Sequence, residues 1–306
     1  MKGKVKLPCK GYPGHGPGIP HRCKGNFHFY LWITSGYNFR MPGVQIKTGM
    51  RIRAAGCSGS EVPGRNFASY LLDEKILLDA GSVTNLLDIE SQMKIETVLI
   101  THTHLDHVKC IPFLADNVFL KDPLHKSIVV AAPAKILEGL KQHIFNGVIW
   151  PDFTSIPSPE APMLKFTALK EEEPYMVDNY SITAYRINHN GSAVGYLVEE
   201  QATGKRLFYS GDTGPAQKTW KMLGSKPLDC FLIDVSFPNA MERQALASGH
   251  LTPSLLKMEL ETMQHKPGMV WAIHSKPFFL DEIARELEDL GIENLGLLAK
   301  GQQLEL

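Results

Sequence analysis

Four side chains of the kind that bind metal ions lie within six residues of this 306-residue chain, in the run His102-Thr-His104-Leu-Asp106-His107. The run directly follows the apolar stretch 97–101, which reads as a short buried strand. Imidazole nitrogen and carboxylate oxygen are the donors that ions of the zinc class prefer. A run of surface polar residues is the alternative, but chance produces this pattern in roughly one chain of this size in a thousand. The run therefore predicts a metal site at the end of a strand, where His102, His104 and Asp106 would share one face.

Three further donors stand at or just after other predicted strands: His189 after 180–188, Asp212 after 206–210 and His274 after 269–273. A single histidine after a strand is more often a surface or core residue than a ligand. Here one arrangement repeats, with a donor at the carboxyl end of a strand, and this repetition favours a common site. Because a carboxylate has two oxygens, Asp212 could bridge two metal ions. The set predicts a two-metal centre.

The hydrophobic pattern predicts an α/β fold, an αββα sandwich of two mixed β-sheets flanked by helices. Strands are expected first in pairs and then alternating with helices, an order that suits two sheets packed face to face. The expected strands are 50–55, 69–72, 75–79, 97–101, 127–131, 180–188, 193–199, 206–210, 230–235 and 269–273, and the expected helices are 108–117, 134–144, 253–264 and 280–290. The proline-rich stretch 150–163 is expected to be a surface loop.

Residues 1–49 are rich in Gly, Pro, Lys and His and show no sustained periodicity, so they read as an irregular N-terminal extension to one patterned domain at 50–306. Three origins of this segment are compatible with the sequence: a native extension, a segment added to the protein, and a translation start assigned too far upstream. The extension contains Cys9, His15, His21 and Cys23, whose spacing matches no familiar zinc finger.

Composition narrows the classes of function. Acidic and basic residues balance at 32 each, which argues against a long nucleic acid as partner but not against a small anionic substrate. Five scattered cysteines favour reduced thiols over a disulfide framework. No apolar run has the length of a membrane span, and no signal-peptide layout is present, so cytoplasmic residence is expected by default.

Taken in order, the run His102 to His107 and the later His189, Asp212 and His274 resemble the ligand set of the metallo-β-lactamase superfamily. The resemblance covers about residues 50–306 and implies an αββα sandwich with a binuclear centre at one edge. It implies that one metal is held by His102, His104 and His189. The other would be held by Asp106, His107 and His274, with Asp212 bridging the two.

Within that superfamily the sequence is most similar to class II 3′,5′-cyclic-nucleotide phosphodiesterases. The stretch 104–112 matches their His-Leu-Asp-His-apolar-x-Gly pattern, except that Cys110 stands where that family has a small glycine. The segments 248–253 and 274–277 support the same resemblance. The first of these is also similar to the Gly-His-Ser-Thr segment of tRNase Z.

The expected reaction is hydrolysis of cAMP or cGMP to the 5′-monophosphate by a metal-bound hydroxide, since two divalent ions lower the pKa of a shared water. His250 is the candidate proton donor or phosphate contact, because it precedes a predicted helix N-terminus with Thr252 as N-cap and Pro253 at the first position. Lys276 is a second candidate phosphate contact. Asp106 could act both as ligand and as proton shuttle.

Three alternatives remain: a tRNase Z-like RNA-processing endonuclease, a thioester or lactone hydrolase of the same fold, and an inactive binding protein. The endonuclease is disfavoured because the chain lacks a long basic insertion after the first motif. His and Asp donors suit zinc first, with manganese or iron as alternatives. The family resemblance also makes a homodimer an expectation.

Overall fold

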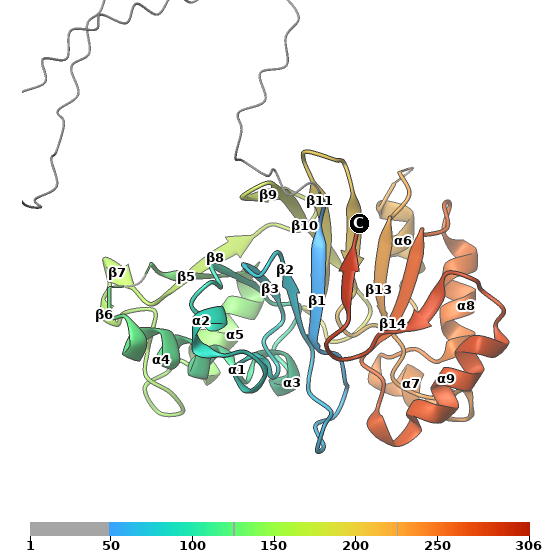
Figure 1. Cartoon of the computed structure of the whole chain (residues 1–306), viewed down its shortest axis with the longest axis horizontal. Coiled ribbons are helices and arrows are strands. Elements are labelled where there is room, and N and C mark those ends of the chain that lie inside the picture. The colour runs from blue at the N-terminus through green and yellow to red at the C-terminus, as the bar shows by residue number, and fades with distance from the viewer. Residues whose placement is uncertain (1–48, 125, 225) are drawn as a thin grey trace, which may run out of the picture. The chain divides into compact units, whose positions relative to one another are not determined.

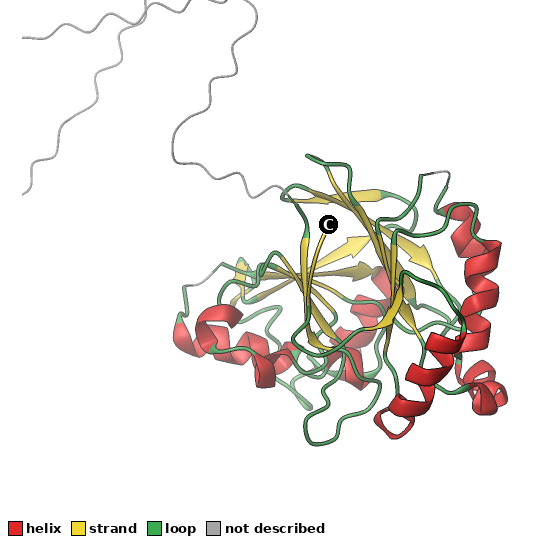
Figure 2. Ribbon diagram, turned by 45° about the vertical axis from the view of Figure 1, so that its right-hand side comes forward, coloured by secondary structure: helices red, strands yellow, loops and turns green. Residues whose placement is uncertain are grey.

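The computed structural model describes residues 49–124, 126–224 and 226–306. Two β-sheets pack face to face, and helices cover the outer face of each sheet (Figures 1 and 2). This is the αββα sandwich that the sequence predicted. The segment 1–48, with the histidines and cysteines noted above, lies outside the described residues.

The first sheet has seven strands in the order β16-β1-β2-β3-β4-β5-β8. Their bounds are β1 Arg51–Gly56, β2 Ser69–Leu72, β3 Ile76–Leu78, β4 Thr97–Leu99, β5 Ile128–Pro133, β8 Leu164–Leu169 and β16 Gln303–Glu305. Strands β3, β4, β5 and β8 run parallel, whereas β16, β1, β2 and β3 pair antiparallel. The turn between β2 and β3 contains Asp73 and Glu74, both at positive φ, as the predicted hairpin there requires.

The second sheet has seven strands in the order β15-β14-β13-β12-β11-β10-β9. Their bounds are β9 Pro174–Val177, β10 Tyr180–Arg186, β11 Val194–Glu200, β12 Arg206–Tyr209, β13 Cys230–Asp234, β14 Met269–Ile273 and β15 Leu295–Leu297. Strands β12 to β15 run parallel, and β10 has the same direction because β11 is antiparallel to both of its neighbours. All five residues of β13 are buried, as expected for a central strand covered on both faces.

The helices of the described residues fall into two groups, one beside each sheet (Figure 1). The first group is α1 Val83–Leu86, α2 Ile89–Gln92, α3 Leu105–Val108, α4 Ile111–Lys121 and α5 Ala134–His143, and the second is α6 Gln217–Met222, α7 Glu242–Ser248, α8 Pro253–Thr262 and α9 Leu280–Asp289. One hydrophobic core contains buried residues of both sheets and of helices α4 and α5. Another lies between the second sheet and the second group of helices.

Several details differ from the sequence-based expectation. The helix predicted at 108–117 is wrong in its bounds: α3 ends at Val108, and α4 begins at Ile111 and continues to Lys121. Pro112 lies in the first turn of α4, the part of a helix that tolerates the missing N–H. The stretch 150–163 is not wholly loop, because β6 Pro157–Ser158 pairs with β7 Ala161–Pro162.

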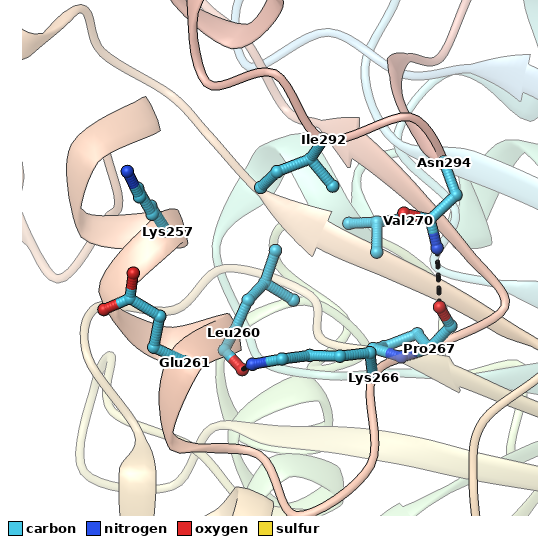
Figure 3. Close-up of a pocket in the computed structure, with 8 residues that line it drawn as sticks. All are labelled: Lys257, Leu260, Glu261, Lys266, Pro267, Val270, Ile292 and Asn294. Atoms are coloured by element: carbon cyan, nitrogen blue, oxygen red, sulfur yellow. Dashed lines mark hydrogen bonds between the residues drawn. The ribbon is translucent and has the colours of Figure 1, made fainter.

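A pocket of about 250 Å³ opens between α8 and the start of β14. Leu260, Val270 and Ile292 form its apolar floor, and Lys266 extends along one side to donate a hydrogen bond to the Leu260 carbonyl (Figure 3). Val270 lies near the beginning of β14, whereas His274 follows its end. The pocket is therefore at the other end of this strand from the predicted metal ligands.

Among the described residues, none of the helices combines the length and the apolar character needed to cross a lipid bilayer.

Candidate metal centre

The carboxyl ends of five strands with a common direction in their sheets carry the polar side chains of the site. His102 follows β4, His189 follows β10, Asp212 follows β12, Asp234 ends β13 and His274 follows β14. The fold thus brings to one place donors that are up to 172 residues apart in the sequence. It also corrects one local expectation: α3 begins at Leu105, so Asp106 and His107 lie on a helix and do not share a strand face with His102.

The seven predicted donors form two groups whose ligand atoms lie within 4.8 Å of one another. The first group contains His102, His104, His189 and Asp212, and the second contains Asp106, His107, Asp212 and His274. These are the two sets that the family resemblance implied, and Asp212 belongs to both. The geometry makes each group capable of holding a divalent ion, while metal binding by the individual residues stays a prediction.

The two carboxylate oxygens of Asp212 face different groups. Its Oδ2 lies 3.7 Å from His102 Nε2 and 3.9 Å from His189 Nε2. Its Oδ1 lies 3.1 Å from His107 Nε2 and 3.3 Å from His274 Nε2. Donors about 2.1 Å from a tetrahedral ion stand roughly 3.4 Å apart, so these separations fit shared ligation. Asp212 therefore has the position of a bridging ligand.

Four histidines have their Nδ1 atoms fixed by protein oxygens. His107 Nδ1 lies 2.7 Å from Asp79 Oδ2, and His189 Nδ1 lies 2.9 Å from the Gly249 carbonyl. Since a carbonyl or ionised carboxylate can only accept, both rings donate from Nδ1, and the neutral form of each ring therefore has its lone pair on Nε2. Nε2 is the atom that each of them turns toward the donor groups.

The other two rings are fixed through hydroxyl groups. Thr101 donates its hydroxyl proton to Asp79 Oδ2, so it accepts from His102 Nδ1 at 3.0 Å. Ser236 donates its proton to Asp234, so it accepts from His274 Nδ1 at 2.9 Å. The hydrogen bonds thus set one tautomer on all four rings, and hydrogen bonds of this kind orient metal-binding histidines in proteins. Of the two threonines that flank His102, Thr101 takes part in these hydrogen bonds.

Asp79 is a buried hub that the sequence analysis did not single out. Its carboxylate accepts hydrogen bonds from the Thr101 N–H at 2.8 Å, from the Thr101 and Tyr209 hydroxyls and from His107. Its side chain is fully buried, and its backbone has a positive φ of 54°. An aspartate as the last residue of the strand predicted at 75–79 was the available signal, and the observed β3 ends one residue earlier, at Leu78. His274 also has a positive φ, and such backbone strain concentrates at functional sites.

The electrostatics of the donor groups favour a cation. Three buried atoms, His102 Nε2, His107 Nε2 and Asp212 Oδ1, form no well-aligned hydrogen bond with the described residues. Buried polar atoms without partners are costly and rare. Burial works against protonation of His107, but the carboxylates of Asp212 and Asp79 outweigh it and raise its pKa well above the usual value. A divalent ion would accept the lone pairs of the histidine nitrogens and balance the negative charge of the carboxylates. The residues present therefore fit such an ion.

His250 stands beside the second group, with its ring stacked on that of His274 at a centroid distance of 5.4 Å. It donates from Nδ1 to Asp234 Oδ2 at 2.6 Å, and Thr252 and Pro253 cap α8 as the sequence predicted. Burial lowers the tendency of His250 to protonate, but Asp234 outweighs it and raises the pKa. Asp234 was missed because a buried aspartate at a strand end has no motif of its own.

Lys276 lies at the rim of the site. Its ammonium donates to the Gly59 carbonyl at 2.6 Å and stands 6.0 Å from the centre of the Phe237 ring. The loop after β1 packs tightly here, since a Cβ at Gly59 would lie 2.2 Å from the His274 carbonyl oxygen. The loop after β1 thus supports a predicted ligand. At the position of the family's glycine, the buried Cys110 thiol lies 3.3 Å from the Gly81 carbonyl.

The fold and the paired donor groups define the class of protein as an αββα sandwich with two clusters of possible metal ligands at one edge. The family model of the β-lactamase superfamily domain matches residues 75–274, which is about two thirds of the chain. The chain belongs to this superfamily and has the metallo-β-lactamase fold, which confirms the family and the fold that the sequence predicted.

Relatives within the family include phosphodiesterases and ribonucleases. The chain is 25% identical over 209 residues to a probable 3′,5′-cyclic-nucleotide phosphodiesterase of Yersinia pestis, covering 63% of this chain and 58% of the relative. It is 30% identical over 151 residues to ribonuclease Z of Pyrococcus abyssi, covering 45% of this chain and 44% of the relative. The chain thus aligns with about half the length of these relatives. The crystal structure of unliganded yeast PDE1 matches with a TM-score of 0.71 at 18% identity, over 84% of this chain and 99% of that one.

Proposed function

We propose that this protein is a binuclear metal-dependent phosphodiesterase that hydrolyses a 3′,5′-cyclic nucleotide to the 5′-monophosphate. The observation that carries the proposal is the Asp234–His250 pair beside two donor groups that share Asp212. Such a site combines positive charge for a phosphoryl group with a proton source for a leaving oxygen. The Yersinia relative supports a cyclic nucleotide as the substrate.

The seven donors would hold two divalent ions, which would stabilise charge on the phosphoryl oxygens and make a water molecule acidic enough to attack. Zinc is the proposed metal, since nitrogen and oxygen donors at tetrahedral separations suit it, with manganese or iron as alternatives. Hydrogen bonds from Nδ1 hold the rings of His102, His107, His189 and His274 so that Nε2 would be the atom offered to the ions.

His250 is the proposed proton donor to the leaving alkoxide. Its Nδ1 proton is committed to Asp234, so Nε2 is the atom from which a transferable proton would leave. Its ring lies against His274 on one side and 5.8 Å from the Phe237 ring on the other. This position is next to the donor groups, where a scissile ester bond would lie.

Two further residues are proposed to contact the substrate or move protons. The Lys276 ammonium donates one hydrogen bond to the Gly59 carbonyl, and its other N–H groups could donate to a phosphate oxygen. Asp106 is part-exposed at 22% and lies 3.3 Å from His274 Nε2, so it can serve as ligand and exchange protons with solvent. A small anionic nucleotide is the proposed partner, and the protein is proposed to be a cytoplasmic homodimer.

A substrate panel with zinc or manganese tests the proposal. The panel contains cAMP, cGMP, bis(p-nitrophenyl) phosphate, a precursor tRNA and a lactone. We expect turnover of a cyclic nucleotide, with the 5′-monophosphate and not the 3′-monophosphate as product. Hydrolysis of the simple diester alone would refute the cyclic substrate and retain the phosphodiesterase class. No diester hydrolysis by the metal-loaded protein would refute both.

An RNA-processing endonuclease is the second candidate, favoured by the Pyrococcus ribonuclease Z relative. The balance of 32 acidic and 32 basic residues argues against it, since a long polyanion is usually bound by a basic excess. Cleavage of the precursor tRNA at a unique position, without turnover of cAMP or cGMP, would establish this second candidate.

A further inference from the structure

A separate cavity lies on the other side of the loop that supports His274. It has a volume of about 80 Å³ and lies between the loop after β1 and the segment that follows β15. Its polar lining comes from Ser58, Arg65, Asn66, Ser275 and Lys300, and no acidic side chain lines it. None of these residues belongs to the two donor groups of the metal centre.

The charge of this cavity is positive and uncompensated. The guanidinium of Arg65 forms no hydrogen bond or ion pair within the described part of the chain, and Lys300 bonds only to the amide oxygen of Asn66, at 2.7 Å. Both cations act electrostatically on Cys57, which also lines the cavity. Burial nevertheless raises the pKa of the Cys57 thiol to about 11, so this thiol adds no negative charge at neutral pH.

The floor of the cavity is buried, and its segments are hydrogen-bonded to a predicted metal ligand. Ser58 and Ser275 are 5% and 2% exposed, and the Ser58 hydroxyl donates to the Ser275 carbonyl. The His274 N–H donates to the Cys57 carbonyl at 2.9 Å, and the Gly59 N–H donates to the Ser275 carbonyl. A ligand in the cavity would therefore rest on the same short segments that position a predicted metal ligand.

We propose that this cavity is a binding site for a small oxyanion of the phosphate class, held by Arg65 and Lys300. A guanidinium presents paired N–H donors that match a phosphate or carboxylate edge, and the amide of Asn66 adds a further donor. The oxyanion could be free phosphate or a phosphate monoester. It could also be a second phosphate of an extended substrate whose scissile diester lies at the metal centre.

Inorganic phosphate is the probe for the first experiment, titrated by calorimetry into the metal-loaded protein at constant ionic strength. Phosphate can also reach the metal centre, so the readout is a difference between variants. Arg65→Gln/Lys300→Gln should bind one equivalent fewer than the wild type. The control Lys94→Gln/Lys218→Gln removes the same charge from exposed positions outside the cavity and should bind as the wild type does. Equal binding by all three proteins, or an equal loss in both variants, would overturn the proposal.

A second variant guards against misfolding. Ala299 is exposed and lines the cavity, so Ala299→Glu would place a carboxylate beside the two cations without removing either. It should abolish the same equivalent of phosphate while the circular dichroism spectrum stays that of the wild type. Retention of that equivalent by a folded Ala299→Glu variant would also overturn the proposal.

Kinetic measurements distinguish a free oxyanion from a phosphate group of the substrate. Only this experiment rests on the proposed phosphodiesterase activity. If the ligand is a free anion, phosphate should change kcat in the wild type and not in Arg65→Gln/Lys300→Gln. If it is part of the substrate, that variant should raise KM about tenfold for a 5′-phosphorylated dinucleotide and leave KM for cAMP unchanged. Loss of phosphate binding in a protein that cleaves no diester would refute the proposed function and leave the anion site intact.

Discussion

Asp79 accepts both hydrogen-bond donors of Thr101, the backbone N–H at 2.8 Å and the hydroxyl at 2.7 Å. Because the hydroxyl proton is committed to Asp79, Thr101 can only accept from His102. The same carboxylate accepts from His107. One buried residue thus sets the orientation of two predicted ligands, one in each donor group, although it belongs to neither group itself.

Replacing Asp79 should weaken metal binding. In Asp79→Asn, the amide can donate as well as accept, so the tautomers of His102 and His107 are no longer fixed. Loss of such an orienting partner typically costs 10- to 100-fold in metal affinity. Competition with a chromogenic chelator measures the affinity, and Asp289→Asn, an exposed position on α9, is the control. Unchanged metal affinity in Asp79→Asn would show that the rings are oriented by packing alone.

Replacing Asp212 should separate the two donor groups. The amide of Asp212→Asn has only one oxygen, so a single group would keep its complete set of donors. We expect metal content to fall toward half of the wild-type value and diester hydrolysis to be lost, whereas Asp212→Ala should lose metal from both groups. Elemental analysis of the dialysed proteins gives the stoichiometry. Wild-type metal content in Asp212→Asn would contradict the bridging position.

Removing the imidazole of His250 should slow turnover without removing metal. We expect His250→Ala to lower kcat for a cyclic nucleotide by about a hundredfold or more, the usual contribution of a general acid. The loss should be much smaller for bis(p-nitrophenyl) phosphate, since p-nitrophenolate leaves without a proton. Asp234→Asn should act in the same direction, and the exposed His143→Ala is the control. An equal loss for both substrates, or loss of metal, would assign His250 a different role.

The fold and the donor set could be predicted because their signals are local. An apolar strand followed directly by donors recurs at His102, His189, Asp212 and His274, and only a fold that gathers strand ends brings these residues together. Strand β14 follows the predicted bounds, since its hydrophobic run is short and bounded.

Other features had a weak local signal or none. Asp79 and Asp234 are single aspartates whose importance lies in hydrogen bonds to residues distant in sequence. Edge strands such as β9 and β16 alternate weakly and are fixed by pairing with their neighbours. The break between α3 and α4 was missed because the apolar residues on either side of it have helical spacing.

The contact between Gly59 and His274 predicts that the packing of the loop after β1 affects metal binding, although Gly59 offers no ligand atom. An added Cβ at Gly59 would lie 2.2 Å from the His274 carbonyl oxygen and 2.8 Å from its Nδ1. Gly59→Ala should therefore lower the free energy of unfolding by about 1–3 kcal/mol, as overpacking does, and weaken metal binding by displacing His274. The matched control is Gly191→Ala, because nothing lies within 4 Å of a Cβ at this loop position. Urea unfolding and metal content would be measured on both variants. If Gly59→Ala equals Gly191→Ala in both measurements, the loop does not position His274, and the shared wall between the metal centre and the cavity at Arg65 and Lys300 would lose its support.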